Sequence, residues 1–192
     1  KFNFSQKNSI KKYNFYVDLS QIELFNNLIN FHKKIDDEFF LELDATEFKD
    51  NYEIENLKLF NSKNNFLFKN IKLNNNYQII GFNLIEAKFE NKEGFINDII
   101  INKKNKNIEL ISKKFDISSN IKENLKSSES SNFFDIFYNL NSTIKIDIRS
   151  AKIDNEYILK NLTGNTSIKN NKVDKSSISA NFNSIDKFLF TK

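Results

Sequence analysis

The stretch from Thr143 to Phe182, TIKIDIRSAKIDNEYILKNLTGNTSIKNNKVDKSSISANF, decides the fold class. It begins with isoleucine at every second position and charged residues between them: Ile144, Ile146 and Ile148 alternate with Lys145, Asp147 and Arg149. A period of two is typical of a strand with one buried face. The alternation then stops at short polar joints and restarts after each one. This stretch therefore predicts a meander of antiparallel strands with one apolar face and one charged face.

A similar pattern occurs earlier in the chain. The segment 41–65, LELDATEFKDNYEIENLKLFNSKNN, aligns without a gap on 146–170 at an offset of 105 residues. The order of strand, joint and strand is the same in both, and several residues are identical, among them Tyr52 with Tyr157, Leu57 with Leu162 and Ser62 with Ser167. We interpret the two segments as copies of one β unit. The alternative is that any two amphipathic meanders would align equally well.

Length and composition limit the classes of protein to consider. The 192 residues fit one domain or one segment of a longer array. Methionine is absent, so we expect the chain to be processed or to be part of a longer protein. No apolar run approaches the roughly 18 residues that a membrane-spanning helix needs. The absence of cysteine excludes disulfides and thiolate metal sites.

The charge pattern argues against a nucleic-acid partner. The net charge is +4, from 29 basic and 25 acidic residues, and Arg149 is the only arginine. A nucleic-acid-binding protein usually gathers Arg and Lys into one patch, whereas here lysines and carboxylates alternate along the predicted strands. The 21 phenylalanines include pairs at alternate positions, such as Phe66 and Phe68. So many large side chains indicate either a large core or an apolar face open to an apolar ligand.

Residues 20–35, SQIELFNNLINFHKKI, are predicted to form an amphipathic helix. Ser20 and Glu23 have the spacing of a capping box. At about 100° per residue the apolar side chains share one half of the helical wheel: Ile22, Leu24, Phe25, Leu28, Ile29, Phe31, His32 and Ile35. We expect this half to pack on the sheet. The alternative is a helix that lies on a membrane surface.

The remaining chain divides into two predicted β units. Residues 1–38 form a leading strand at 13–17 and the helix, and residues 39–117 read as strands separated by turns about every 8–12 residues. The predicted turns include 74–76, 91–94 and 103–106. The polar, serine-rich segment 118–132 is predicted to be an exposed linker. Residues 133–192 form the second unit, which begins with the short apolar piece 133–140.

No constellation of residues indicates catalysis. His32 is the only histidine and lies within the apolar pattern, so a packed histidine is the better interpretation than a catalytic one. Asp36, Asp37 and Glu38 are best explained as a solvated turn. Three glycines in total leave no glycine-rich phosphate loop. We therefore expect no enzyme, no cofactor and no metal site.

Residues 143–182 resemble the β-repeat of the AsmA-like family of Gram-negative envelope proteins, which includes the TamB- and YhdP-type lipid-bridge proteins. The resemblance rests on the alternating isoleucines, on the strand Leu159-x-Asn161-Leu162-x-Gly164, and on the last strand, Val173-Asp174 followed by Ile178-Ser179-Ala180-x-Phe182. The segment 20–48 also resembles the way a domain of this family begins. The first copy departs from the motif, because Leu59 stands where the second copy has Gly164.

The resemblance implies a mainly β fold in which a long, curved antiparallel sheet forms a groove, apolar inside and charged outside. It implies intermembrane phospholipid transport and outer-membrane biogenesis, in the periplasm, by a protein anchored in the inner membrane through an N-terminal helix beyond this sequence. The partners would be phospholipid acyl chains and flanking β units of the same chain. The lipid-facing residues would be Ile144, Ile146, Ile148, Leu41, Leu43, Leu57, Phe66, Phe68, Phe82, Leu162, Ile178 and Phe182. Two non-enzymatic alternatives remain: a structural or adhesive cell-surface β-repeat with a closed core, and a soluble carrier of one lipid of the lipocalin type.

Overall fold

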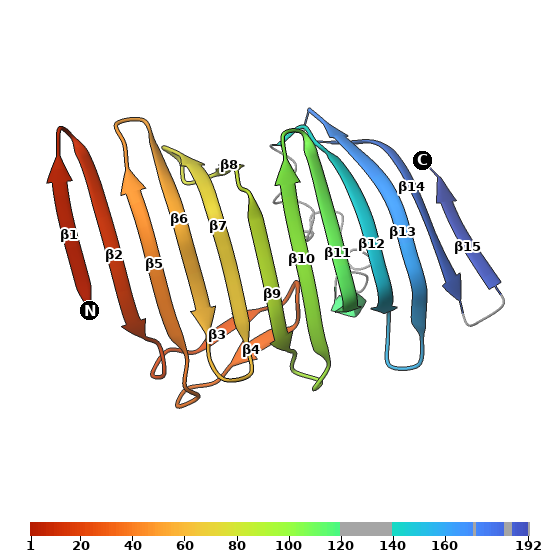
Figure 1. Ribbon diagram of the computed structural model, residues 1–192. Helices are drawn as coiled ribbons and strands as arrows, with labels where there is room; N and C mark the ends of the chain where they lie inside the picture. The colour runs from red at the N-terminus through yellow and green to blue at the C-terminus, as the bar shows by residue number, and fades with distance from the viewer. Residues whose placement is uncertain (120–139, 171, 183–185, 192) are drawn as a thin grey trace.

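The strands form one continuous layer in the computed structural model (Figure 1), which describes residues 1–119, 140–170, 172–182 and 186–191. A sheet of 13 strands has the order β1-β2-β5-β6-β7-β9-β10-β11-β12-β13-β14-β15, with the short β8 paired to β7. The strands are β1 (Phe2–Lys7), β2 (Ile10–Asp18), β5 (Phe40–Glu47), β6 (Asn51–Phe60), β7 (Asn65–Asn74), β8 (Ile79–Gly81), β9 (Leu84–Glu90), β10 (Ile96–Lys104), β11 (Asn107–Asp116), β12 (Thr143–Lys152), β13 (Ile158–Lys169), β14 (Lys172–Phe182) and β15 (Asp186–Thr191). The expectation of a mainly β protein is confirmed.

The sheet is mixed rather than purely antiparallel. Neighbouring strands run antiparallel except β11 and β12, which pair in parallel with Asn107 opposite Thr143 and Asp116 opposite Lys152. Two parallel strands cannot be joined by a tight turn, because the chain must return to the starting end of the first strand. The connection from β11 to β12 contains the predicted linker 118–132 and the piece 133–140. Apart from Ser118, Ser119 and Leu140, both lie outside the described residues, and Ser118 itself is buried.

Asparagine takes the role that glycine has in most turns. Among the described residues, ten non-glycine residues have positive φ, and seven of them are asparagines: Asn8, Asn30, Asn70, Asn105, Asn141, Asn161 and Asn170. Asparagine tolerates the left-handed conformation better than other non-glycine residues do, because its short amide hydrogen-bonds to the local backbone. The predicted turn at 91–94 lies between strands, and those at 74–76 and 103–106 begin within the last residues of β7 and β10. A chain with three glycines can therefore still make many tight turns.

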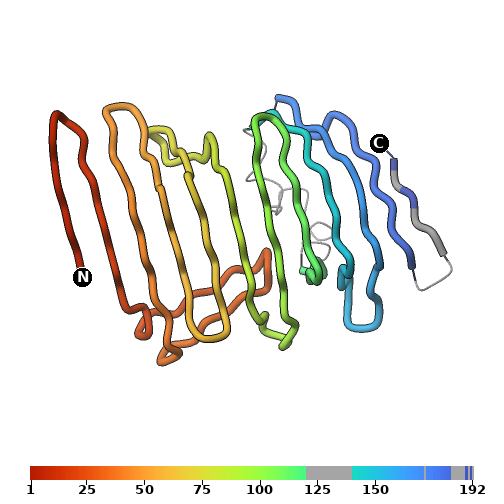
Figure 2. The backbone as a smooth tube through the Cα atoms, in the orientation of Figure 1, coloured from red at the N-terminus to blue at the C-terminus, as the bar shows by residue number. Residues whose placement is uncertain are grey.

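The helix predicted for residues 20–35 is wrong. This segment forms a separate hairpin of β3 (Leu24–Asn26) and β4 (Phe31–Lys33), seen crossing behind the lower part of the large sheet in the tube view (Figure 2). The residues of the supposed capping box have other partners, since Ser20 donates to Asp18 and Glu23 pairs with His32 across the hairpin at 2.7 Å. Asn, Phe, Ile and His are modest helix formers, so tertiary packing outweighs the helical periodicity.

A buried lysine fixes the hairpin to the chain that precedes it. Lys33 is 2% exposed, and its ammonium group donates to the carbonyl oxygens of Leu19, Ser20 and Ile22 at 2.8, 2.7 and 2.7 Å. These three bonds use all three donors of the group, which reduces the cost of burying its charge. Helical periodicity placed Lys33 on the exposed half of the wheel, and only the hairpin turns it inward.

The hairpin covers the lower part of one face of the sheet. The ring of Phe31 lies edge-on to Phe66 and Phe89, with centroid distances of 4.9 and 5.9 Å, and it also contacts Phe39. The tip of the hairpin is tied to the β9–β10 turn by a hydrogen bond from the Lys92 amide to the Asn30 carbonyl. Leu24 and Ile29 pack against the same core, whereas Phe25 is 70% exposed. The apolar residues of the segment thus divide between core and surface.

Phe31→Ala should lower the free energy of unfolding by about 3–5 kcal/mol, as truncation of a buried phenylalanine does. Phe25→Ala in the same hairpin should change it by less than about 0.5 kcal/mol, because the ring is largely in water. Urea denaturation of the two variants measures both values. Equal losses would contradict the hairpin and restore the helical arrangement.

The two segments that align at an offset of 105 residues form hairpins whose registers agree over 41–44 and 56–59, and differ by one residue beyond a bulge between Asp44 and Ala45. Leu41 lies opposite Leu59 and Leu43 opposite Leu57 in β5–β6. The equivalent positions in β12–β13 are also partners, since Ile146 lies opposite Gly164 and Ile148 opposite Leu162. The glycine has a local cause: a Cβ atom at Gly164 would lie 2.7 Å from the carbonyl oxygen of Ser177 in β14. Leu59 has a different neighbour, Phe66 of β7, and needs no such close approach.

A buried polar network joins the lower ends of β11 and β12 to the β9–β10 turn. Asp116 is 1% exposed; its carboxylate accepts from the Asn91 amide at 2.8 Å and lies 3.3 Å from the Lys152 ammonium. Asn97 accepts from the backbone amide of Asp116 at 2.8 Å. Lys152 also binds Glu93, and this hydrogen bond together with the charge of Asp116 raises the pKa of Lys152. The network fixes where the parallel pair ends.

Candidate ligand-binding face

The inner face of the sheet, defined as the side that carries Ile144, Ile146 and Ile148, presents apolar residues in rows that run across the strands. Strand register places directly paired residues on the same face, so each row can be followed from strand to strand. The first row is Val17, Leu41, Leu59, Phe66, Ala87, Ile99, Ser112, Ile148 and Leu162. The second row is Phe2, Phe15, Leu43, Leu57, Phe68, Ile85, Ile101, Leu110, Ile146, Gly164 and Ile178.

Exposure changes steadily along these rows. In the second row, Phe2 is 57% exposed, Leu43 and Leu57 are half-buried, and Ile101 and Ile146 are 2% and 4% exposed. The inner face is therefore accessible over β1, β2, β5 and β6 and closed over β10 to β12. Only the first part can admit a ligand without rearrangement.

The structure places the predicted lipid-facing residues on this one face, but in two environments. Ile144, Ile146 and Ile148 alternate with exposed Lys145, Asp147 and Arg149, as predicted from their period of two. Those that are buried are Ile144, Ile146, Ile148, Leu162, Phe66 and Phe82. Those that are half-buried are Leu41, Leu43, Leu57, Phe68, Ile178 and Phe182. Ile144, Ile146 and Ile148, whose alternation predicted the face, are thus among its least accessible residues.

Sequence reasoning missed the most exposed apolar residues of the face. Phe2 and Phe4 of β1 pair with Phe15 and Tyr13 of β2, with ring centroids 4.8 and 5.5 Å apart. The alternation in 13–17 did indicate a strand, which β2 confirms. The signal that could have added these rings is the matching alternation of Phe2 and Phe4, which a lysine- and asparagine-rich context obscured.

Polar groups interrupt the rows toward β11 to β14. Ser112 lies between Ile99 and Ile148, and its buried hydroxyl has no hydrogen-bond partner among the described residues. Thr166 and Ser176 are also buried and hydrogen-bond to each other through their hydroxyls at 3.0 Å. An unsatisfied buried hydroxyl is destabilising. This part of the face is therefore less uniformly apolar than the alternation of isoleucines predicted.

A charged cluster borders the accessible part of the face at its upper end. Glu47 accepts from the Lys11 ammonium at 2.8 Å and from the Tyr13 hydroxyl at 2.6 Å. Both bonds favour the ionised carboxylate, so they lower the pKa of Glu47, first through Lys11 and then through Tyr13. The same bonds raise the pKa of Lys11 and of Tyr13. The cluster holds the Tyr13 ring in place beside Phe4 and Phe15.

Tyr13→Phe should raise the pKa of Glu47 toward its ordinary value, because one of two hydrogen bonds to the carboxylate is lost. A carboxylate whose folded pKa is lowered stabilises the fold above the ordinary carboxyl pKa, and this contribution is lost as pH falls through the folded value. The wild-type protein should therefore lose more stability than Tyr13→Phe between pH 5 and about pH 3. An NMR titration of the Glu47 carboxyl carbon measures the pKa; an unchanged value in Tyr13→Phe would contradict the hydrogen bond.

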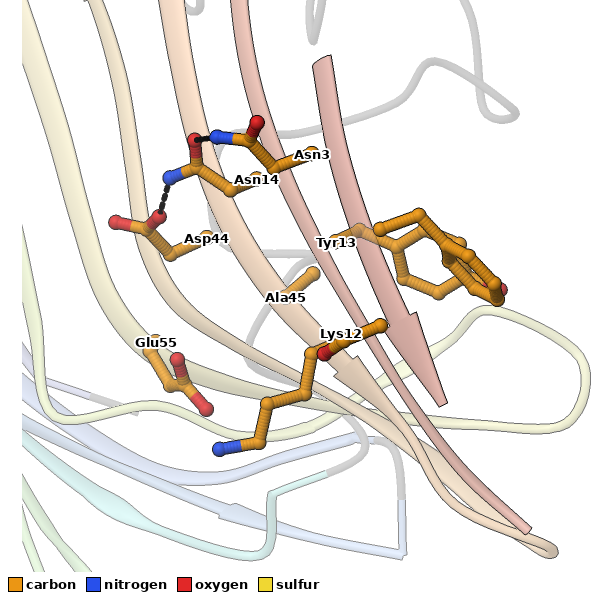
Figure 3. A pocket seen from close by; sticks show the side chains of 9 residues that line it. Asn3, Lys12, Tyr13, Asn14, Asp44, Ala45 and Glu55 are labelled. Atoms are coloured by element: carbon orange, nitrogen blue, oxygen red, sulfur yellow. Dashed lines mark hydrogen bonds between the residues drawn. The ribbon is translucent and has the colours of Figure 1, made fainter. Parts of the chain in front are cut away.

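The opposite, outer face is mainly polar over β1, β2 and β5, apart from an aromatic cluster of Tyr16, Phe40 and Phe60 near its lower end. Asn3 donates to Asn14 at 3.2 Å and Asn14 donates to Asp44, which forms a chain of side chains across β1, β2 and β5. They border an open pocket of about 210 Å³ whose lining also includes Lys12 and Glu55. Figure 3 shows that the ring of Tyr13 points to the other side of the strands from Asn14 and Asp44. The lining also includes Phe4, Tyr13 and Ala45, which register places on the inner face, so the pocket is not confined to the outer face.

Chemistry elsewhere is limited within the described part of the chain. No three of its His, Asp and Glu side chains are arranged to hold a metal ion. His32 is bonded to Glu23 on the outside of the small hairpin, away from the large sheet's rows. Asp36, Asp37 and Glu38 are exposed, as predicted for a solvated turn. No helix there has the length and apolar character to cross a membrane.

Comparison of the chain with protein families, with curated proteins and with solved structures finds no match. The argument for function therefore rests on the inner face itself.

Ile146→Glu should abolish cooperative folding or cost more than about 4 kcal/mol, because a carboxylate at a 4% exposed position lacks water and a cationic partner. Lys145→Glu, next to it on the outer face, removes an ion pair with Glu109 and should cost less than about 1 kcal/mol. Thermal unfolding of both variants measures the difference. Survival of Ile146→Glu with a near-native melting temperature would mean that this part of the face is open to water.

Proposed function

We propose that the inner face binds the acyl chains of phospholipids and that the protein acts without covalent chemistry. The observation that supports this is the pair of apolar rows, which run unbroken from β2 to β10 and are accessible over β2, β5 and β6, with Phe2 of β1 extending the second row. Accessible apolar surface of this extent is unfavourable in water and favours an apolar ligand. A chain of methylene groups needs surface rather than directed hydrogen bonds, and rows of Phe, Leu and Val offer that.

The dimensions of the face suit an extended chain. Side chains in neighbouring rows are two residues apart along each strand, or about 7 Å, which leaves a furrow between rows. Over the accessible strands β1, β2, β5 and β6 the furrow crosses three strand spacings, about 14 Å. One leaflet of a bilayer is about 15 Å of hydrocarbon, so most of an acyl chain fits along the accessible part. The chain would run across the strands, with its end toward the buried rows of β9 to β12.

Within this proposal the protein is a segment of an AsmA-like envelope protein whose sheet curves into a groove. It would take part in phospholipid transport between membranes and in outer-membrane biogenesis, in the periplasm, with flanking β units on either side and an inner-membrane anchor. The resemblance of 143–182 to that family's repeat supports this wider proposal, as does the register that the two aligned hairpins share over 41–44 and 56–59 of the first copy.

A second function is favoured by a specific observation. Ile144, Ile146 and Ile148 are 0–4% exposed, which is what a structural or adhesive β-repeat with a closed, dry core would have. That protein would present its surface to a partner and hold no ligand. The two functions differ in whether anything occupies the rows over β1 to β6.

A matched pair of aromatic residues on β2 tests the lipid proposal. Phe15 lies on the inner face and Tyr16 on the outer face, where its ring stacks on Phe40 at 5.8 Å. A photo-crosslinking residue at 15 should capture lipid, and one at 16 should not. Phe15→Glu should reduce the phospholipid that co-purifies with the protein at least fivefold, whereas Tyr16→Glu should leave it within twofold. Mass spectrometry of the extracts measures both.

Absence of co-purified phospholipid from the wild-type protein, with no capture at position 15, would favour the structural function. Equal capture at 15 and 16 would indicate nonspecific adsorption and would also count against a face-specific site.

A further inference from the structure

The two ends of the sheet differ in charge. The upper rim comprises the turns and strand ends drawn uppermost in Figure 1, and within the described residues it carries seven lysines and two carboxylates: Lys7, Lys49, Lys103, Lys104, Lys106, Lys169 and Lys172, against Glu47 and Asp50. Within the described residues the lower rim carries ten carboxylates against six lysines and the amino terminus: Asp18, Glu23, Asp36, Asp37, Glu38, Glu90, Glu93, Asp116, Asp154 and Glu156, against Lys1, Lys33, Lys34, Lys63, Lys92 and Lys152. A near-neutral sequence thus folds into a sheet that is basic at one end and acidic at the other.

The positive charge gathers at one part of the upper rim, which we call the basic corner: Lys103, Lys104, Lys106 and Lys172. Lys103 is half-buried and the other three are exposed, and none forms an ion pair with another described residue. These lysines lie at two turns, β10–β11 and β13–β14, and hydrogen bonds connect both turns to the residues at the start of β12. The Lys106 carbonyl accepts from the Thr143 amide at 2.9 Å, and Asn141 accepts from the Asn170 amide at 2.8 Å.

Exposed apolar side chains lie beside the basic corner. The connection from β7 to β9 projects Tyr77 and Ile80, which are 67% and 50% exposed. It is joined to the corner by a hydrogen bond from the Lys103 amide to the Asn83 carbonyl at 2.8 Å. Tyr77 has φ of 57°, an uncommon conformation for an aromatic residue, and its ring stacks on Tyr52 at 5.0 Å. The backbone thus supports a ring that remains mostly in water.

We propose that this end of the sheet docks on an anionic membrane surface, with the basic corner on lipid headgroups and Tyr77 and Ile80 in the interfacial layer. Clustered lysines are attracted to anionic lipid, and tyrosine with an aliphatic neighbour favours the boundary between headgroups and hydrocarbon. A nucleic acid fits less well, because the corner has no arginine and no ring placed among the lysines for stacking on a base. The lower rim also has exposed apolar residues, such as Phe25, but carboxylates surround them and anionic lipid would repel it.

Docking orients the molecule with its strands upright on the membrane. The rows of the inner face cross the strands, so they then run parallel to the membrane, with the row of Val17, Leu41 and Leu59 on the side away from it. This inference does not depend on acyl-chain binding, since a structural protein could dock in the same way.

Vesicle co-sedimentation tests the proposal. The wild-type protein should bind vesicles of phosphatidylcholine with 30% phosphatidylglycerol at least tenfold more tightly than pure phosphatidylcholine vesicles. Binding should weaken as salt rises, because screening shortens the reach of the lysines. Replacement of Lys103, Lys104, Lys106 and Lys172 by Gln should weaken binding roughly 600-fold, since each lysine near an anionic surface contributes roughly fivefold.

The control removes the same charge from the lower half of the sheet. Lys34, Lys88, Lys92 and Lys114 are exposed and form no ion pair with another described residue, and their replacement by Gln should change vesicle binding by less than threefold. Tyr77→Ser with Ile80→Ser should weaken binding about tenfold without removing its salt dependence. Circular dichroism confirms that each variant is folded.

Three results would overturn the proposal: no preference of the wild-type protein for anionic vesicles, equal losses in the two quadruple variants, or tighter binding of a duplex oligonucleotide through the same four lysines. Loss of vesicle binding with co-purified phospholipid intact would separate docking from the acyl-chain function.

Discussion

The register of the parallel pair β11–β12 determines whether the apolar residues of the strands before it and after it lie on the same face of the sheet. Most other neighbours in the sheet are joined by short turns, which fix their register directly. Here the register is set at a distance, by the bond from Thr143 to Lys106 at one end and by the contact of Asp116 with Lys152 at the other. A slip of one residue would turn Ile144, Ile146 and Ile148 to the outer face. The buried carboxylate and its partners are thus responsible for the continuity of the rows.

The same constraint explains why the inner face is uneven. In the hairpins β1–β2 and β5–β6 a short turn fixes the register. There the rows consist of large rings and aliphatic chains that remain partly accessible. Around the parallel pair the side chains are smaller, more tightly packed and interrupted by Ser112 and by the hydroxyl pair of Thr166 and Ser176. Ligand binding therefore depends on β1, β2, β5 and β6, whereas the cohesion of the sheet depends on the strands around β11 and β12, on the same face.

The presence of strands, and which side chains share a face, could be predicted from the sequence because a period of two is typical of a strand with one buried face. The alternation around Ile146 correctly gave which residues point inward, and the turns rich in Asn were found from composition. The hairpin of residues 20–35 could not be predicted, because Leu24, Phe31 and Lys33 owe their positions to Phe66, to Phe89 and to carbonyl groups on another segment. Nor could burial be predicted: the alternation gives the face of Ile146 but not what covers it. The exposed rings of Phe2 and Phe4 were missed for the same reason.

The connection between β11 and β12 also sets an order of events during synthesis. Strands β1 to β11 can form their sheet as soon as they leave the ribosome, since each pairs with a strand already made. The edge of β11, with Ile108 and Leu110, must then wait for the 36 residues from 117 to 152 before its partner is complete. At 5–20 residues per second this leaves an apolar strand edge unpaired for a few seconds. Such an edge is a template for pairing with another nascent chain, so this interval is when the protein is most prone to aggregate.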